Sequence, residues 1–343
     1  MGSDRNPQDD AGVPDLDLDI PKGQSVPLRP SRRHQVLALS GGGYRGLYSA
    51  TFLQHAETHF SAPVGKHFDL LAGTSIGALM AAALAFDVPA TMIAEKIIEH
   101  GPKIFPRRRM LTWTKRTFFR APYSSETLKE AVTDTIGSEN ANRSMKTVEK
   151  PLLIVALNYT NGSPEVFRSR GLAGLKASDA TVLEAVLSSA AAPTYFPPQV
   201  VNNETLIDGG VIANGPELLA ACEGCGELGW HPDDIYILAV GTASRRQGAA
   251  LAPIGRPSAF SWMVRRSLFQ STLAAQEVLA ASQCRTLFGQ RYYRIDREPS
   301  EKQVPAIREF DLTSVAAKNT LESLANASWE EHRSNALFRN FFV

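Results

Sequence analysis

The hydrophobic pattern of the chain alternates short apolar runs with longer segments of helical spacing. Apolar runs bounded by turn residues predict strands at 36–39, 68–72, 152–158, 165–169, 205–207, 235–240 and 290–296. Apolar residues three to four positions apart predict helices at 47–56, 76–86, 91–100, 125–137, 179–190, 258–284 and 313–338. Strands that alternate with helices predict an α/β fold, in which a mostly parallel sheet is covered by helices on both faces.

The N-terminal segment differs in composition from the rest of the chain. Residues 1–33 carry five prolines and no periodic apolar pattern, which predicts a flexible N-terminal tail. No linker interrupts the pattern after that tail. We therefore expect residues 34–343 to form a single domain that includes a helical carboxyl-terminal region.

The composition is that of an ordinary globular protein, with 43% hydrophobic residues, 21% charged residues and a net charge of +1. A net charge near zero provides no general basic field for a nucleic-acid polymer. Three cysteines argue for a reducing compartment and against a disulfide scaffold. The most apolar run, 76–86, is shorter than the roughly 20 residues of a membrane span, and acidic residues stand where a signal peptide needs a basic start. We expect a cytoplasmic protein.

The first predicted strand ends at a glycine-rich turn, which reads Gly41-Gly42-Gly43-Tyr44-Arg45-Gly46. Its glycines fit the fingerprint G-x-G-x-x-G of a nucleotide-binding Rossmann-like protein. That fold needs an acid at the carboxyl end of its second strand, whereas Asp69 stands at the start of the second apolar run. The other interpretation is an oxyanion hole, because N–H groups on a glycine turn at a helix N-terminus point toward negative charge. Arg45 would add a positive charge there or tie the loop down.

The second predicted strand ends at Gly73-Thr74-Ser75-Ile76-Gly77, which has the form G-x-S-x-G. Between a strand and a helix this motif predicts a nucleophile elbow, in which a sharp turn presents the Ser75 hydroxyl and the flanking Gly73 and Gly77 avoid clashes. The alternative is a helix N-cap in which Ser75 only accepts a backbone N–H.

A serine nucleophile needs a base, and Asp208 stands at the end of the predicted strand 205–207. Gly209 and Gly210 follow it and predict a tight turn that leaves the carboxylate exposed. Asp208 could then accept the serine proton directly in a Ser–Asp dyad. An Asp-Gly turn in a hairpin is the alternative. His231 and His332 are the histidines that follow plausible acids, but neither stands just beyond a strand end, so we interpret both as structural.

Together and in this order, the three motifs resemble those of the patatin-like phospholipases. That family carries a G-G-G-x-R-G turn, a G-x-S-x-G elbow and a D-G-G/A motif, which this chain shows at 41–46, 73–77 and 208–210. Similar stretches also lie at 190–198, 211–216 and 237–242, so the resemblance spans roughly residues 34–300. Ser40 departs from the pattern, since many members have Asp before the glycines.

The resemblance implies a three-layer α/β/α sandwich and a lipid acyl hydrolase of the phospholipase A type. It implies that Ser75 is the nucleophile, that Asp208 is the base, and that Gly42, Gly43 and Gly41 supply oxyanion N–H groups beside Arg45. Gly46, Gly73, Gly77, Gly209 and Gly210 would support the motifs. The reaction would be hydrolysis of a phospholipid ester through an acyl-serine intermediate, without a metal or other cofactor. A catalytically inactive ligand-binding module remains an alternative.

The segment Lys103-Ile104-Phe105-Pro106 and both chain ends look like those of bacterial patatin-like effectors of antiphage defence, which cyclic dinucleotides activate. Residues 103–120 carry seven basic residues with interleaved aromatics and no acid. They would suit an anionic bilayer at the inner membrane face or the phosphates of a cyclic dinucleotide, or they form a solvated basic loop. The candidate basic residues are Arg107, Arg108, Arg109, Lys115, Arg116, Arg245 and Arg246. An oligomer is compatible with the sequence.

Cysteine spacing gives no metal site. Cys222-Glu223-Gly224-Cys225 is half of a zinc ribbon, and no second pair completes it. We expect a surface loop at these residues.

Overall fold

Eight strands form one sheet in the part of the chain that the structure describes. The structure is a computed structural model, and it describes residues 32–106, 121–169, 178–244 and 268–343. The described residues from Arg33 to Val343 belong to one compact unit. The strands are β1 (His34–Leu39), β2 (Leu70–Thr74), β3 (Leu152–Asn158), β4 (Ser163–Arg168), β5 (Gln199–Val201), β6 (Glu204–Asp208), β7 (Ile235–Val240) and β8 (Tyr292–Ile295).

The strand order is β5-β6-β3-β2-β1-β7-β8, and β4 also pairs with β3. Strands β3, β2, β1, β7 and β8 run parallel to their neighbours in this order. Strands β4 and β6 run antiparallel to β3, and β5 runs antiparallel to β6. The predicted mostly parallel sheet is confirmed. Strands β3 and β4 form a hairpin, in which Gly162 has a φ of 71°.

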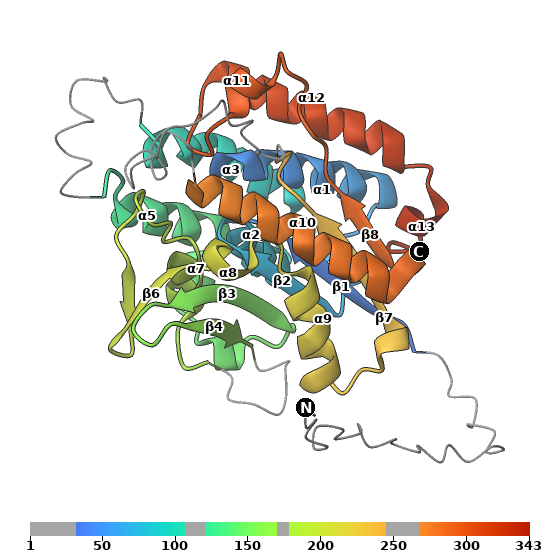
Figure 1. Cartoon of the computed structure of the whole chain (residues 1–343), viewed down its shortest axis with the longest axis horizontal. Coiled ribbons are helices and arrows are strands. Elements are labelled where there is room, and N and C mark those ends of the chain that lie inside the picture. The colour runs from blue at the N-terminus through green and yellow to red at the C-terminus, as the bar shows by residue number, and fades with distance from the viewer. Residues whose placement is uncertain (1–31, 107–120, 170–177, 245–267) are drawn as a thin grey trace, which may run out of the picture. The chain divides into compact units, whose positions relative to one another are not determined.

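Helices cover both faces of this sheet (Figure 1). The longer ones are α1 (Gly46–Phe60), α2 (Ile76–Ala85), α3 (Ala90–Ile104), α5 (Ser125–Ile136), α7 (Val182–Ser189), α9 (Glu217–Gly226), α10 (Leu268–Phe288) and α12 (Val315–His332). The helices of four residues are α6 (Ser138–Ala141), α8 (Gly210–Ala213), α11 (Val304–Ile307) and α13 (Ala336–Arg339). Helix α12 lies along α1, and α10 crosses the sheet with α9 beside it (Figure 1).

Successive residues of a strand point to opposite faces, and this alternation divides the core into two layers. Leu37 and Leu39 of β1 belong to a large buried cluster with α1, α2, α3, α5, α7 and α12. Val36 and Ala38 of the same strand pack with α9 and α10 on the other face. The α/β fold with three layers is therefore confirmed.

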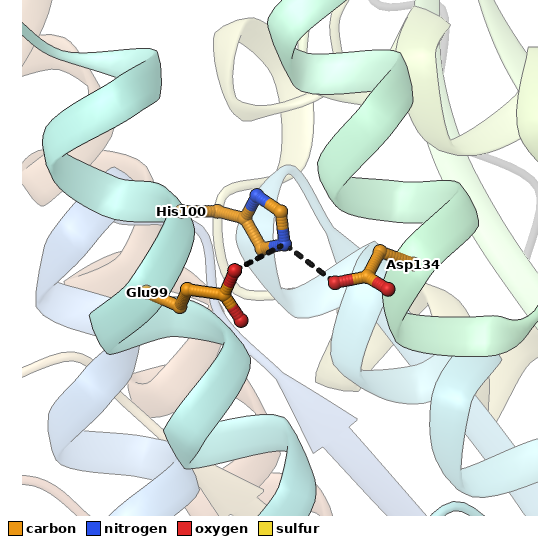
Figure 2. A group of neighbouring side chains, drawn as sticks. All are labelled: Glu99, His100 and Asp134. Carbon is orange, nitrogen blue, oxygen red and sulfur yellow. Dashed lines mark hydrogen bonds and ion pairs between the residues drawn. The ribbon is translucent and has the colours of Figure 1, made fainter.

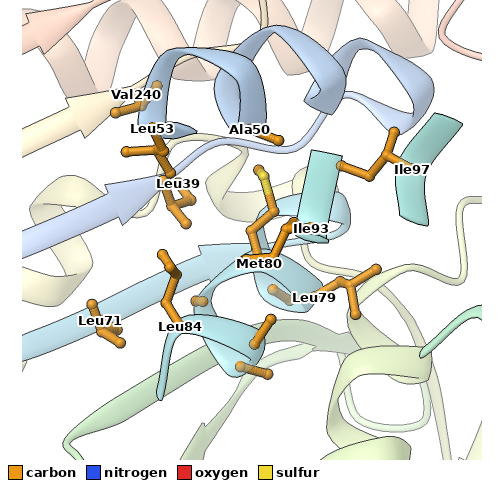
Figure 3. Close-up of a cluster of buried hydrophobic side chains, with 14 of the residues drawn as sticks. Leu39, Ala50, Leu53, Leu71, Leu79, Met80, Leu84, Ile93, Ile97 and Val240 are labelled. Carbon is orange, nitrogen blue, oxygen red and sulfur yellow. The ribbon is translucent and has the colours of Figure 1, made fainter. Parts of the chain in front are cut away.

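Helix α2 lies at the centre of the larger layer. Eight of its ten residues are buried, as expected for a helix that is hydrophobic on all sides. Figure 3 shows Met80 of α2 pointing toward Ala50 of α1, beside Leu39 of β1 and Ile93 of α3. This packing fixes the start of α2, where the serine motif lies.

The expectation of a surface loop at Cys222 and Cys225 is wrong, because both residues lie in helix α9. Glu223 between them is buried and accepts a hydrogen bond of 2.7 Å from Nε of Arg168 in β4. Gly224 obscured the helical pattern, since glycine is a weak helix former.

The remaining predictions differ from the structure mainly at element boundaries. The segment predicted as one helix at 313–338 forms two helices, α12 and α13, and β5 was not predicted. Of the helix predicted at 258–284, residues 258–267 lie outside the described residues, and α10 begins at Leu268. Within the described residues, no helix combines the length and the apolar character that crossing a membrane would require.

Candidate active site

The pairing of the strands brings Ser75 and Asp208 together. Strand β4 pairs with β3 over residues 153–158, so β2 and β6 share the opposite edge of β3. Strand β2 runs parallel to β3 and ends with Thr74 opposite Val155, whereas β6 runs antiparallel and ends with Asp208 opposite Ala156. The carboxyl ends of β2 and β6 therefore meet at consecutive positions of β3, and Ser75 follows directly after Thr74.

Ser75 occupies a strained turn between β2 and α2. Its φ of 55° and ψ of −121° are unusual for a residue with a side chain. A Cβ on Gly73 would lie 2.1 Å from the carbonyl oxygen of Gly77, so this elbow requires glycine. The Ser75 N–H donates to Oγ of Ser189 at 2.9 Å, while the Ser75 side chain makes no capping hydrogen bond to α2. The helix-cap interpretation of Ser75 is therefore not supported.

Ser189, which was not predicted from the sequence, links the elbow to the sheet by hydrogen bonds. Its hydroxyl donates to the Val155 carbonyl oxygen of β3 at 2.5 Å while it accepts the Ser75 N–H. Ser189 is the last residue of α7 and is fully buried. Its role depends on tertiary contacts, so no local sequence signal predicts it.

Asp208 is buried, with only 4% of its surface exposed, which corrects the expectation of an exposed carboxylate. The end of β6 is covered by the chain that follows α7, and the Asp208 N–H donates to the Ala191 carbonyl oxygen at 3.0 Å. Burial raises the pKa of Asp208 from 3.8 to about 7, against the lowering effects of the Gly210 N–H and the Ser75 side chain. The Gly210 N–H donates to Asp208 Oδ1 at 2.6 Å.

Gly209 continues this close packing. A Cβ on Gly209 would lie 2.1 Å from the Val155 carbonyl oxygen, so no larger residue fits without moving β3. Its N–H donates to the Ser189 carbonyl oxygen at 3.3 Å. The D-G-G motif therefore forms the junction between β6, β3 and the end of α7, rather than an exposed hairpin turn.

The glycine-rich turn packs against the serine elbow. A Cβ on Gly41 would lie 3.3 Å from Cβ of Ser75 and 2.5 Å from Oδ1 of Asn214. The Gly41 N–H donates to the Asn214 carbonyl oxygen at 3.0 Å, and the Gly41 carbonyl oxygen accepts from Thr242 Oγ1 at 3.1 Å. The Gly41 N–H is thus already used, which corrects its expected place among the oxyanion donors.

Gly42 and Gly43 differ from Gly41 in this respect. Within the described residues, neither N–H has a protein acceptor, and both residues are partly exposed. Gly43 has a φ of 56°, and a Cβ there would lie 2.6 Å from the Phe310 carbonyl oxygen. Gly46 begins α1, where a Cβ would meet the Ile76 side chain at 2.5 Å. The turn thus presents two unused backbone donors beside Ser75.

Arg45 stabilises the turn through its backbone N–H, which donates to the Gly42 carbonyl oxygen at 3.2 Å. Burial lowers the pKa of its guanidinium, while the charges of Glu277 and Asp296 raise it. Among the described residues no carboxylate forms an ion pair with it, and its Nε has no hydrogen-bond partner. A partly buried positive charge is therefore held near the glycine turn.

The Rossmann-like interpretation lacks its acid. Asp69 precedes β2, and its Oδ2 accepts the N–H of Gln35 at the start of β1 at 2.8 Å. Both residues lie at the edge of the sheet where the parallel strands begin, opposite the glycine turn. The carboxyl end of β2 carries the Ser75 elbow instead.

An apolar cavity adjoins Ser75. It contains about 690 Å³ of free space, counted out to its open mouth. Leu79 of α2, Ile97 of α3, Val132 of α5 and Val186 of α7 contribute to its walls. An apolar cavity with a serine in its wall is suited to an acyl chain.

His231 and His332 do not join this site. His231 accepts the Asp233 N–H at 3.2 Å, and His332 lies 2.8 Å from the Tyr293 hydroxyl, so each is engaged by its own neighbours. The basic candidates lie outside the described residues, namely Arg107, Arg108, Arg109, Lys115, Arg116, Arg245 and Arg246.

Among the described residues, Glu99, His100 and Asp134 could hold a metal ion, because one ligand atom from each lies within 4.8 Å of the others (Figure 2). The Lys96 ammonium lies 2.6 Å from Asp134 Oδ2 and 3.2 Å from Glu99 Oε2, where such an ion would bind. The group is therefore an ion-pair network between α3 and α5.

Comparison with known proteins agrees with this geometry. The family model described as patatin-like phospholipase matches residues 37–221, more than half of the chain. The cGAMP-activated phospholipase of Pseudomonas aeruginosa (strain BWHPSA011 / Pa011) is 33% identical over 325 residues, which cover 90% of this chain and 91% of that protein. The cGAMP-activated phospholipase of Vibrio cholerae serotype O1 is 26% identical over 92% of this chain and 98% of that protein. Patatin-like protein 2 of Arabidopsis thaliana is 27% identical over 64% of this chain and 60% of that protein.

One assignment follows from the three motifs, from the sheet that positions them and from the similarity to relatives over most of the chain. The chain belongs to the patatin-like phospholipase family and is a lipid acyl hydrolase, a carboxylic ester hydrolase.

Proposed function

We propose that Ser75 and Asp208 form the catalytic dyad of this hydrolase and cleave an acyl ester of a membrane phospholipid. One observation carries the proposal: Ser75 stands on a strained elbow beside a buried Asp208, where it lines an apolar cavity close to two unused backbone N–H groups.

The reaction follows from the roles of these groups. The Ser75 hydroxyl attacks the ester carbonyl carbon while its proton passes to the Asp208 carboxylate, and the carbonyl oxygen becomes an oxyanion. Collapse of the tetrahedral intermediate breaks the bond to the lysophospholipid oxygen, which takes the proton from Asp208. Water then attacks the carbonyl carbon of the acyl-serine while Asp208 accepts a proton from it. When the second tetrahedral intermediate collapses, Asp208 returns this proton to the Ser75 oxygen and the free fatty acid leaves.

The pKa of Asp208 suits this role. A general base works best when its pKa is close to the working pH, because it then combines the correct protonation state with sufficient basicity. Burial places the pKa of Asp208 at about 7, whereas an exposed aspartate would be too weak a base. The short bond from the Gly210 N–H to Oδ1 fixes the carboxylate in one orientation.

The oxyanion is proposed to bind the N–H groups of Gly42 and Gly43. One such donor typically contributes about 3 kcal/mol to the lowering of the barrier. Gly41 positions these two donors, since both its N–H and its carbonyl oxygen are held by Asn214 and Thr242. The nearby charge of Arg45 favours the developing negative charge.

We further propose that a cyclic dinucleotide activates the enzyme. The proposal rests on two relatives named cGAMP-activated phospholipase, whose similarity covers at least 90% of this chain. The activator would bind elsewhere, and the basic candidates at 107–116 and 245–246 lie outside the described residues. Contact with the inner membrane face, an oligomer and a role in antiphage defence remain predictions.

The test is hydrolysis of a fluorogenic phospholipid in vesicles by wild type, Ser75→Ala and Ser163→Ala, with and without cGAMP. Ser163 is the first residue of β4 and serves as the matched serine control. We expect Ser75→Ala to lose at least about a thousandfold in kcat, Ser163→Ala to match wild type, and cGAMP to raise wild-type turnover at least roughly tenfold.

Two outcomes separate the parts of the proposal. Substantial turnover by a folded Ser75→Ala protein would show that another residue is the nucleophile. Full activity without cGAMP, together with no heat of cGAMP binding, would remove the activator and leave the dyad.

A further inference from the structure

The apolar cavity beside Ser75 also has polar side chains in its wall. Most of its lining is aliphatic or aromatic, but Lys96 and His100 of α3 and Thr135 of α5 also line it. An acyl chain forms no hydrogen bond or ion pair with an ammonium or an imidazole, so these residues do not bind it favourably. Their position along the cavity decides what they do.

Lys96 lies at the end of the cavity that is remote from the glycine turn, whereas His100 directly precedes Gly101. Gly101 is so close to Tyr44 that a Cβ would meet its ring at 2.4 Å, and Phe105 packs against Phe196 with ring centroids 5.9 Å apart. Tyr44 directly follows Gly43 of the glycine turn. Lys96 is eight residues before Ile104 at the end of α3, so it lies ~12 Å further along the helix axis.

An ion-pair network closes this inner end. The Lys96 ammonium binds Asp134 and Glu99 at 2.6 and 3.2 Å, and His100 Nε2 lies 2.8 Å from Asp134 Oδ2. Figure 2 shows the His100 ring between Glu99 of its own helix and Asp134 of α5. The side chain of Lys96 is 25% exposed and that of Asp134 is 47% exposed. The network therefore stands between the apolar cavity and solvent.

The network opposes the passage of an alkyl chain. A methylene group gains free energy when it leaves water for the apolar part of the cavity. A chain that continued past Ile97 and Val132 would have to separate the Lys96 ammonium from its carboxylates, or press against them. An alkyl chain that touched the ammonium would displace water from it without replacing the lost hydrogen bonds, which opposes further insertion.

We propose that the network of Lys96, Glu99, His100 and Asp134 is the stop that limits acyl-chain length in this enzyme. This inference rests on the proposed function, since it assigns the cavity to the acyl chain of the ester that Ser75 attacks. The substrate class it defines is an ester whose acyl chain ends before Lys96. The network limits the chain by the volume it occupies and by its charge, and it contacts none of the reacting atoms.

The expected signature is a break in the dependence of kcat/KM on chain length. While the chain still lengthens within the apolar part, each added carbon should raise kcat/KM about fourfold, which corresponds to ~0.8 kcal/mol per methylene. Once the terminal methyl reaches the network, further carbons should give no gain. The position of this break measures where the stop is.

The experiment uses a homologous series of p-nitrophenyl esters from butyrate to palmitate in mixed micelles of constant composition, with cGAMP present. Lys96→Ala removes the ammonium and the stem that line the inner end, and should move the break to longer chains. Lys103→Ala is the matched control, because Lys103 binds the same Glu99 at 2.9 Å without lining the cavity. It should leave the break where wild type has it.

A third variant acts in the opposite direction. Ala131 lines the cavity one turn before Thr135, so Ala131→Leu should move the break to shorter chains. If Lys96→Ala keeps the wild-type break, the proposed stop is wrong, whatever Ala131→Leu does. If wild type hydrolyses none of the esters, or folded Ser75→Ala hydrolyses all of them, the proposed function fails instead. If Lys96→Ala does not fold, Lys96→Met, which removes the charge and keeps the stem, takes its place in the same test.

Discussion

Replacing Asp208 by Asn should make the protein more stable while abolishing catalysis. The carboxyl is buried, and its pKa is raised from 3.8 to about 7. Asparagine has nearly the same shape and keeps an oxygen that can accept the Gly210 N–H. It removes the buried charge and, with it, the base.

The size and sign of the effect follow from linkage. Below pH 3.8 the carboxyl is protonated in both the folded and the unfolded chain, so it adds nothing to the pH dependence. As the pH rises from about 4 to about 7, the unfolded chain loses this proton while the folded protein keeps it, and the free energy of unfolding falls. Three pKa units correspond to about 4 kcal/mol, and the whole penalty is present above pH 7.

The assay is urea unfolding of wild type and Asp208→Asn at a series of pH values from 4 to 8. The difference in unfolding free energy should grow with pH up to about 7 and then stay constant, at no more than about 4 kcal/mol. Asp233→Asn, which replaces an exposed carboxyl, should stay within about 0.5 kcal/mol of wild type. A difference between wild type and Asp208→Asn that does not change with pH would refute the buried, raised-pKa carboxyl.

Two further predictions follow from the same site. The value of kcat/KM should rise with pH through about 7 and then level off, because only the ionised Asp208 can accept the Ser75 proton; a pH–rate profile that is flat between 5 and 8 would contradict this. His231→Ala and His332→Ala should each keep kcat/KM within about threefold of wild type, since these rings are engaged by Asp233 and Tyr293; a hundredfold loss in either folded variant would show that the base is a histidine.

Much of the fold can be predicted from the sequence because its core strands are short apolar runs with turn residues at both ends. Strands β3 and β7 begin and end at the predicted residues. Helix α9 was missed because its glycines and its buried Glu223 obscure the apolar pattern. The burial of Glu223 depends on Arg168, which lies 55 positions away, and no local pattern reports such a pair.

In the candidate site, too, features set by the local sequence could be predicted, whereas features set by distant contacts could not. The motifs around Ser75 and Asp208 stand at strand ends, so their placement in the fold could be predicted. The burial of Asp208 could not, because the covering chain at Ala191 comes from another part of the fold. The Gly41 N–H was assigned as an oxyanion donor because the sequence does not show that Asn214 returns to bind it. Those tertiary contacts decide which groups remain available for catalysis.

The measurement that tests the dyad most directly is covalent labelling by a fluorophosphonate, followed by mass spectrometry of the digested protein. We predict one phosphonylated peptide, which carries Ser75, in wild type and in Ser163→Ala. We predict no label in Ser75→Ala and much slower labelling in Asp208→Asn, because the base that activates the hydroxyl is gone. A label on another serine, or equally fast labelling of Ser75 in Asp208→Asn, would contradict the Ser75–Asp208 dyad.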